Sequence, residues 1–210
     1  MIKNIFFDFN GTIIDDLDLC LELLNKFLNG QGKESITKER YKEIFTFPIK
    51  NYYTAAGIDF NIESYESLAI KFIEEYQPRS MSCGLFKEVV PTLKKLKEKG
   101  LHLYILSASE KHNLYEQCQN YGIVDYFDAI LGIDDIHAKS KVQIAKKYIN
   151  ENNINKAETI FIGDTLHDVE VAKEVGCEAR LVSCGHQAIS VLKKANVKIY
   201  SDISSILEEV

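Results

Sequence analysis

The segment "NIFFDFNGTIID" (residues 4–15) combines two apolar runs with acidic and amide side chains. Its apolar run, Ile5 to Phe7, is typical of a buried strand, and the run ends at the carboxylate of Asp8. Asn10 and Gly11 follow, and a second apolar pair comes after them. Open parallel sheets bind their ligands beyond the carboxyl ends of the strands. The stretch therefore predicts the first strand of an α/β sheet with a polar site at its end.

The rest of the chain from about residue 85 alternates between two patterns. Further strands are predicted at 101–107, 127–133, 158–163, 178–185 and 198–201. Helices are predicted between them at 89–100, 111–122, 140–152 and 167–176, and a short helix ends the chain at 202–210. Alternation of this kind predicts right-handed crossovers and a parallel sheet with helices on both faces.

Residues 15–81 are different, because apolar residues recur there with helical spacing. One predicted helix has Leu17, Leu21, Leu24 and Leu28 on one face, and another runs from Tyr65 to a stop before Pro78. Thr37 is a candidate N-cap between them. We therefore predict a Rossmann-like α/β core domain, 1–14 and 82–210, with an inserted all-helical cap domain, 15–81. The predicted hinges are "IIDD" (13–16) and "QPRSMSCG" (77–84).

Composition and charge narrow the classes of function. The 210 residues carry a net charge of -6, which argues against a nucleic-acid partner because phosphate backbones need a basic face. No apolar run approaches the roughly 20 residues that span a bilayer, and "MIKNIFF" does not look like a signal peptide. The five cysteines are scattered without C-x-x-C spacing, which is typical of reduced thiols. We expect a cytoplasmic protein without a membrane partner.

Polar residues gather at the predicted strand ends. Asp8, Ser107 and Asp164 each end a strand, Asp168 follows one turn later, and the loop after 127–133 supplies Lys139 and Lys141. Each residue alone could be a turn residue, a helix cap or a solvated charge. Together they offer oxygen ligands suited to Mg²⁺, a carboxylate that could attack phosphorus, and a cation for phosphoryl oxygens.

Three motifs then carry a resemblance to a known family. "DFNGT" (8–12) resembles the D-x-D-x-T motif of the haloacid dehalogenase-like hydrolase superfamily, "LYILSAS" (103–109) its second motif, and "IGDTLHD" (162–168) its G-D-x-x-x-D motif. The order of the motifs and the helical insertion are similar to the phosphoglycolate phosphatase-like branch. The resemblance implies a Mg²⁺-dependent phosphatase that hydrolyses a small phosphorylated metabolite, a phosphoglycolate-like phosphomonoester, through an aspartyl-phosphate.

The resemblance also implies roles for individual residues. Asp8 would be the nucleophile, and Mg²⁺ would be held by Asp8, the backbone carbonyl of Asn10, Asp164 and Asp168. The substrate would be bound by a lysine and by residues of the first and second motifs: Gly11, Thr12, Ser107 and Ala108. Lys141 is favoured as that lysine over Lys139, because the first turn of a helix is well fixed. We expect a monomer or a weak homodimer.

Asn10 departs from the family's pattern, which has an acidic residue that protonates the leaving group. An amide does not titrate, so three hypotheses stay open. The chain could be a phosphatase with a good leaving group or another proton donor. It could be a phosphonoacetaldehyde hydrolase-like C–P hydrolase that uses Lys50 of the cap, in the aromatic-rich loop "FTFPIKNYYTAAG" (45–57). It could also be a non-catalytic regulatory protein that binds phosphate.

Overall fold

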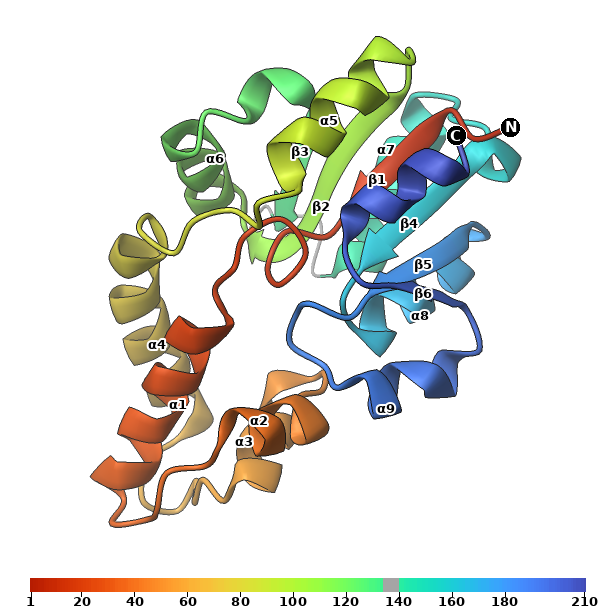
Figure 1. The fold of residues 1–210 in the computed structure, drawn as a ribbon. Coiled ribbons are helices and arrows are strands. Elements are labelled where there is room, and N and C mark those ends of the chain that lie inside the picture. Colours follow the sequence, from red (N-terminus) through yellow and green to blue (C-terminus); the bar gives the residue numbers. More distant parts are fainter. Residues whose placement is uncertain (134–139) are drawn as a thin grey trace.

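The computed structural model describes residues 1–133 and 140–210. Within these residues, one six-stranded sheet has the order β3-β2-β1-β4-β5-β6, and all neighbouring strands are parallel (Figure 1). The strands are β1 (Asn4–Phe7), β2 (His102–Glu110), β3 (Ala129–Ile133), β4 (Thr159–Gly163), β5 (Glu178–Val182) and β6 (Lys198–Tyr200). The predicted parallel α/β sheet is confirmed.

Side chains of successive residues in β1 point to opposite faces of the sheet, and each face has its own core. Ile5 and Phe7 pack with the helices α5 (Val89–Glu98) and α6 (Lys111–Asn120) and with the 3₁₀ helix η4 (Ile203–Glu208). Phe6 packs with α7 (Lys141–Glu151) and α8 (Leu166–Val175) on the other face. Buried strands covered on both faces read as continuous apolar runs, as β1 does.

Shorter elements complete the C-terminal half of the chain. They are η1 (Val124–Tyr126), η2 (Lys156–Glu158), α9 (Ile189–Leu192) and η3 (Lys193–Ala195). The loop between β5 and α9 runs toward the helical insertion, where the Ala188 amide donates to the Lys42 carbonyl at 2.8 Å. This loop therefore contacts the insertion in addition to the two chain connections.

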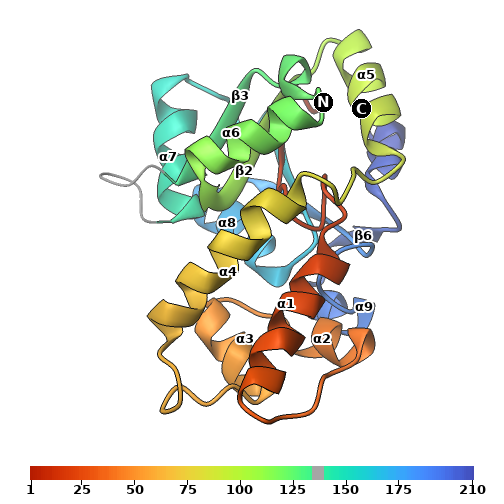
Figure 2. The same cartoon turned by 90° about the vertical axis from the view of Figure 1, so that its left-hand side faces the viewer.

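The insertion after β1 consists of α1 (Leu17–Gly30), α2 (Lys38–Ile44), α3 (Ile49–Ala56) and α4 (Tyr65–Ser80). These helices share a separate apolar core and lie beyond one end of the sheet (Figures 1 and 2). The two connecting segments run side by side, because Ile14 and Leu85 form an antiparallel bridge and the Asp15 amide donates to the Gly84 carbonyl at 3.0 Å. The domain limits at 14/15 and 81/82 stay a prediction.

Two local predictions were wrong. α4 does not stop before Pro78 but continues to Ser80, with Pro78 inside its last turn. β2 does not end at Ser107 but continues to Glu110, with a register shift against β3 between Leu106 and Glu110. The predicted Thr37 cap is confirmed, since its side chain accepts a hydrogen bond from the Arg40 amide.

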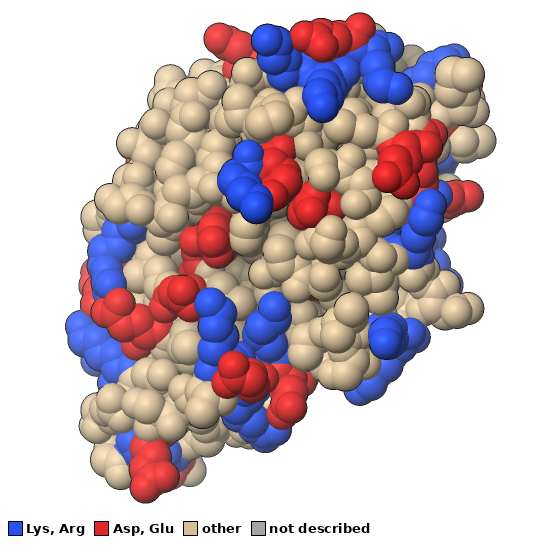
Figure 3. All heavy atoms as spheres, viewed as in Figure 1, with Lys and Arg blue, Asp and Glu red and all other residues tan. Residues whose placement is uncertain are grey.

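The face drawn in Figure 3 has a mixed charge, with Lys and Arg side chains interspersed among Asp and Glu. None of the helices that the structure describes combines the length and the apolar composition needed to cross a membrane. The expected absence of a nucleic-acid or membrane partner, the cytoplasmic location and the oligomeric state stay predictions.

Candidate active site

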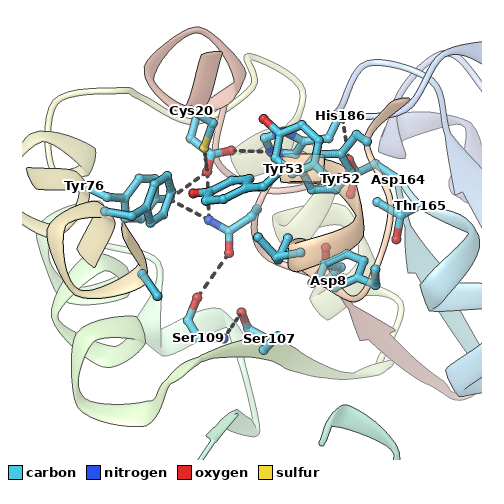
Figure 4. A pocket seen from close by; sticks show the side chains of 18 of the residues that line it. Asp8, Cys20, Tyr52, Tyr53, Tyr76, Ser107, Ser109, Asp164, Thr165 and His186 are labelled. Atoms are coloured by element: carbon cyan, nitrogen blue, oxygen red, sulfur yellow. Dashed lines mark hydrogen bonds and ion pairs between the residues drawn. The ribbon is translucent and has the colours of Figure 1, made fainter. Parts of the chain in front are cut away.

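A cavity of about 350 Å³ lies between the carboxyl ends of β1, β2 and β4 and the helical insertion (Figure 4). Asp8, Ser107 and Asp164 line its sheet end, and each follows or belongs to a different strand. The opposite wall comes from α2, α3 and α4. The convergence that was predicted from strand ends therefore exists, and it opens into the insertion.

Lys141 joins two carboxylates at the sheet end of this cavity. Its Nζ lies 2.7 Å from Asp8 Oδ1 and 2.6 Å from Asp168 Oδ1, and the Lys141 side chain is only 5% exposed. The side chain is well fixed because Lys141 is the first residue of α7, after the N-cap Ser140. The structure thus brings Lys141 to Asp8, whereas the alternative, Lys139, lies outside the described residues.

Asp168 is anchored from two sides. It occupies the third position of α8, where its Oδ2 accepts hydrogen bonds from the Thr165 amide at 3.1 Å and the Thr165 hydroxyl at 2.7 Å. This is a capping box, in which Thr165 rather than Asp168 is the N-cap. Burial raises the pKa of Asp168, but Lys141 and the Thr165 hydrogen bonds outweigh it and hold that pKa below its usual range.

The pKa values of the other two carboxylates are raised. Burial is the largest cause at Asp8, and the charges of Asp168 and Asp164 add to it against the opposing Lys141. Burial likewise raises the pKa of Asp164 to about 6, against the opposing charge of His186. Two buried carboxylates, Asp164 and Asp168, and the partly buried Asp8 thus lie together beside one lysine, and this excess of negative charge is the environment that a bound cation would relieve.

The donor set fits a small divalent cation. Asp8, Asp164 and Asp168 each offer a carboxylate oxygen, and these oxygens lie within 4.8 Å of one another. Oxygen ligands are those that Mg²⁺ prefers, and Mg²⁺ is commonly held by one or two carboxylates together with water and substrate phosphate. A bound cation would also favour the ionised forms of Asp8 and Asp164.

The loop after Asp8 is tied down differently from the prediction. Gly11 was predicted as a substrate ligand, but its amide already donates to Asp16 Oδ1 at 3.0 Å and to the Ile14 carbonyl at 3.0 Å. Gly11 is needed for packing, because its φ is +70° and a Cβ there would lie 2.4 Å from Asp164 Oδ2 and 2.5 Å from His186 Cδ2. Thr12 is fully buried and donates to Asp164 Oδ1 at 3.2 Å, which orients the carboxylate rather than a substrate.

Asn10 is held by three polar side chains. Its Nδ2 donates to Asp16 Oδ2 at 2.8 Å and to the Tyr76 hydroxyl at 2.6 Å, and its Oδ1 accepts from the Ser109 hydroxyl at 3.2 Å. The Tyr76 hydroxyl in turn donates to Asp16 Oδ2 at 2.7 Å. An amide at position 10 is therefore matched to a neighbouring carboxylate, to which an ionised aspartate could not donate.

His186 is the second partner of Asp16 and was not predicted as a site residue. Its Nε2 lies 3.1 Å from Asp16 Oδ1, its Nδ1 lies 2.8 Å from the Tyr41 hydroxyl, and its backbone amide donates to Asp164 Oδ2 at 2.6 Å. Burial lowers the pKa of His186, but Asp16 outweighs this effect and raises it to about 8. His186 follows β5 by only a few residues, so the strand-end rule could have identified it.

Asp16, Cys20 and His186 could also be considered as a metal site, since their ligand atoms are close together. The oxygens of Asp16, however, already accept hydrogen bonds from the Gly11 amide, the Asn10 amide and the Tyr76 hydroxyl, and they pair with His186. This group is therefore a hydrogen-bonded network that links the Asp8 loop, the insertion and the loop after β5.

The predicted second-motif residues lie at the cavity. Ser107 is buried, and its Oγ accepts a hydrogen bond from the Ser109 amide at 3.0 Å, while Ala108 is exposed and also lines the cavity. Lys50 is different: it is exposed, and its Nζ lies over the Phe60 ring at 5.4 Å. Among the described residues that line the cavity, Lys50 is absent, so the predicted role of this lysine finds no support in the geometry.

Comparisons with known proteins agree with this fold. A pyrophosphatase, PpaX, from Anoxybacillus flavithermus is 25% identical over 83% of this chain and 80% of its own length. A phosphoglycolate phosphatase from Vibrio vulnificus is 25% identical over 88% of this chain and 85% of its own. A haloacid dehalogenase-like hydrolase from Streptococcus pneumoniae superposes with a TM-score of 0.83 over 99% of this chain and 98% of its own, at 19% identity.

The sequence profile described as "Haloacid dehalogenase-like hydrolase" matches residues 5–182, which include the strand ends that carry Asp8, Ser107 and Asp164. The predicted membership is confirmed, together with the similarity to phosphoglycolate phosphatases. The chain belongs to the haloacid dehalogenase-like hydrolase family.

Proposed function

We propose that the protein is a Mg²⁺-dependent phosphatase that hydrolyses a small organic phosphate through an aspartyl-phosphate on Asp8. The observation that carries this proposal is the buried arrangement in which Lys141 bridges Asp8 and Asp168 beside Asp164, at the end of a cavity. The relatives named phosphoglycolate phosphatase and pyrophosphatase support a reaction at phosphorus.

Each residue of this arrangement has a role in the proposal. Asp8 Oδ2 attacks phosphorus, since Oδ1 accepts the hydrogen bond from Lys141. Lys141 and the Ser107 hydroxyl hold phosphoryl oxygens, and Lys141 also keeps Asp8 oriented. Asp8, the Asn10 carbonyl, Asp164 and Asp168 would hold Mg²⁺, which when bound stabilises the charge on the transferring phosphoryl group.

Asn10 limits the leaving groups that this site can release quickly. Its amide cannot supply a proton, and general acid catalysis is worth about 10²–10⁴-fold in rate. Tyr76, the nearest hydroxyl, donates to Asp16, and burial raises the pKa of this phenol well above its usual value. The side chains in contact with Asn10 are Asp16, Tyr76 and Ser109, and the cation of His186 is paired with Asp16. None of these described groups is a free acid at Asn10, so the proposed phosphatase would favour leaving groups that depart as anions.

The test is phosphate release from a panel of phosphate esters and pyrophosphate, with Mg²⁺ and with EDTA. The proposal predicts turnover of at least one compound that requires Mg²⁺ and is lost in Asp8→Asn. Circular dichroism and the thermal midpoint of Asp8→Asn serve as the control for folding. Turnover that persists in Asp8→Asn, or that is unaffected by EDTA, would contradict it.

The two other hypotheses from the sequence are outcomes of the same panel. Turnover of phosphonoacetaldehyde that borohydride blocks would support the C–P hydrolase, although Lys50 lies exposed over Phe60 rather than in the cavity. Tight binding of phosphate or Mg²⁺ without any turnover would support the regulatory protein.

A further inference from the structure

The part of the cavity that faces the insertion is aromatic. Its described lining there includes the rings of Phe45, Phe47, Tyr52, Tyr53 and Phe72. The rings come from α3, α4 and the segment between α2 and α3, and several are in contact: Phe45 and Phe47 are 5.7 Å apart between ring centres, and Phe45 and Tyr52 are 5.1 Å apart. These packed side chains form a preformed aromatic wall of the cavity that Asp8 also lines. Figure 4 labels two of its rings, Tyr52 and Tyr53.

The cavity can hold more than a phosphoryl group. Its volume of about 350 Å³ compares with the roughly 150 Å³ that accommodates a benzene molecule in an engineered protein cavity. A phosphoryl group at Asp8 therefore leaves space for one six-membered ring between the aromatic side chains. Aromatic rings favour offset or edge-on contact with another ring, which a flat ligand can make here.

Charge in the cavity is confined to its sheet end. Among the described lining residues, the cationic groups are Lys141, which is paired with Asp8 and Asp168, and His186, which is paired with Asp16. A substrate carboxylate that extended into the aromatic part would lose its hydration and would meet no cation among the described lining residues there, where the polar groups are tyrosine hydroxyls. The cavity is therefore poorly matched to phosphoglycolate, whose second charged group would point away from the phosphoryl site.

Two independent observations thus agree on the leaving group. The aromatic lining favours a flat uncharged ring, and the amide of Asn10 favours an oxygen that departs without a proton. We propose that the substrate is the phosphate monoester of a phenol- or enol-type hydroxyl on an uncharged ring. This inference rests on the proposed phosphatase function and names its substrate class.

The reaction balances without an acid at position 10. The Asp8 carboxylate forms a bond to phosphorus while the P–O bond to the ring breaks, and the ring oxygen leaves as an anion with the electron pair. Water then attacks phosphorus, the bond to Asp8 breaks, and inorganic phosphate is released. The proton lost by that water neutralises the departed oxyanion in solution.

The first experiment compares kcat/KM for phenyl phosphate, cyclohexyl phosphate, 2-phosphoglycolate and pyrophosphate. We expect phenyl phosphate to exceed 2-phosphoglycolate by at least about 100-fold, because an apolar site leaves the carboxylate unpaired. It should exceed cyclohexyl phosphate, a ring of similar size with a poor leaving group, by about 100-fold or more. Equal or faster turnover of 2-phosphoglycolate or pyrophosphate would overturn the substrate class and leave the phosphatase proposal standing.

The second experiment measures binding without turnover, by calorimetry with phenylphosphonate and phosphonoacetate in the presence of Mg²⁺. Phenylphosphonate should bind at least about tenfold more tightly, because only its ring fits an apolar wall. This preference in a protein that turns over no phosphate ester would support the ligand class and refute the phosphatase. Equal affinities would overturn the inference.

A pair of substitutions on α4 tests whether the cavity wall sets the preference. Ile73 lines the cavity and is 50% exposed, whereas Ile70 on the same helix is 61% exposed and is not among the described lining residues. Ile73→Lys should improve kcat/KM for 2-phosphoglycolate relative to phenyl phosphate by about tenfold, because it supplies a cation. Ile70→Lys should leave the ratio unchanged. An equal effect of both substitutions would contradict a role of the wall.

Discussion

Replacing Asn10 by aspartate is the change for which the structure gives the sharpest expectation. The Asn10 amide donates to Asp16 Oδ2 at 2.8 Å, and Asp16 is buried with a side-chain exposure of 0%. In Asn10→Asp an ionised carboxylate would face another carboxylate at this position. We therefore expect the variant to be less stable than the natural chain at alkaline pH and nearly as stable at acidic pH.

The size of the effect follows from the distance between the charges. Two unit charges about 4 Å apart repel by about 4 kcal/mol at an effective dielectric constant of 20. The protonated His186 on the other side of Asp16 offsets part of this, so about 4 kcal/mol is an upper bound. At 1.36 kcal/mol per unit, the repulsion would raise the pKa of the new carboxyl by up to about 3 units above its usual value of about 3.9.

The sign of the pH dependence follows from this raised pKa. Below about pH 4 the carboxyl is protonated in both states and donates to Asp16 as the amide does, so little stability is lost. The loss grows as the pH rises toward the folded pKa, near 7 at most, and is constant above it. The assay is denaturant unfolding of the natural chain and Asn10→Asp between about pH 4.5 and 8.5.

A double variant distinguishes charge repulsion from a change in packing. In the exchange variant Asn10→Asp/Asp16→Asn, one carboxylate and one amide face each other again, so the pH-dependent part of the loss should shrink. The reasoning is refuted if Asn10→Asp has the stability of the natural chain at pH 8.5, or if its loss is the same at every pH.

Three further predictions concern the charged groups of the site. Lys141→Met should lose about 3–5 kcal/mol in the free energy of unfolding at neutral pH, since it leaves Asp8 and Asp168 without their cation. An unchanged midpoint of denaturant unfolding would contradict a stabilising role of these ion pairs. Mg²⁺ at 100 times its dissociation constant should raise the free energy of unfolding by about 2.7 kcal/mol. The stabilisation should be smaller at about pH 5 than at pH 7.5, because Asp164, with a pKa of about 6, must lose its proton to bind the cation. Calorimetric melting measures this, and a larger rise of the thermal midpoint at pH 5 would contradict it. His186, with a pKa raised from 6.5 to about 8, should contribute about 2 kcal/mol of stability below pH 6.5, and this contribution is lost as the pH rises through 8. The free energy of unfolding of His186→Gln, measured at pH 6 and pH 9, should therefore depend less on pH than that of the natural chain.

Much of the site was predictable because ligand-binding residues of an open parallel sheet lie at the carboxyl ends of its strands. Asp8 and Asp164 follow strands that read as apolar runs, and parallel strands end at one edge, so their meeting could be predicted without coordinates. Lys141 could be predicted because the first residue of a helix that crosses over this edge has little freedom. The apolar pattern predicted the second strand but not where it ends. The register shift that accompanies the extension of β2 past Ser107 has no signal in the sequence.

The features of the site that were not predicted depend on contacts between segments that are far apart in the chain. Asp16 was predicted only as part of a hinge. Its partner His186 is 170 residues away in the sequence, so this contact exists only in the folded chain. Lys50 was predicted from its place in the aromatic-rich loop 45–57 of the cap, but that place does not say which side of α3 faces the cavity. Gly11 was predicted as a substrate ligand, whereas its amide donates to Asp16, and no sequence pattern predicts this contact.

In the proposed reaction Asp8 becomes phosphorylated during turnover. The direct measurement mixes the enzyme with excess phenyl phosphate, or with the best substrate of the panel, in the presence of Mg²⁺, and quenches in acid within the first turnovers. Peptide mass spectrometry then locates any phosphoryl group. We expect one phosphoryl group on Asp8 in the peptide that contains residues 4–15, and none in Asp8→Asn or without Mg²⁺. Sustained turnover with a phosphoryl group on another residue would contradict it.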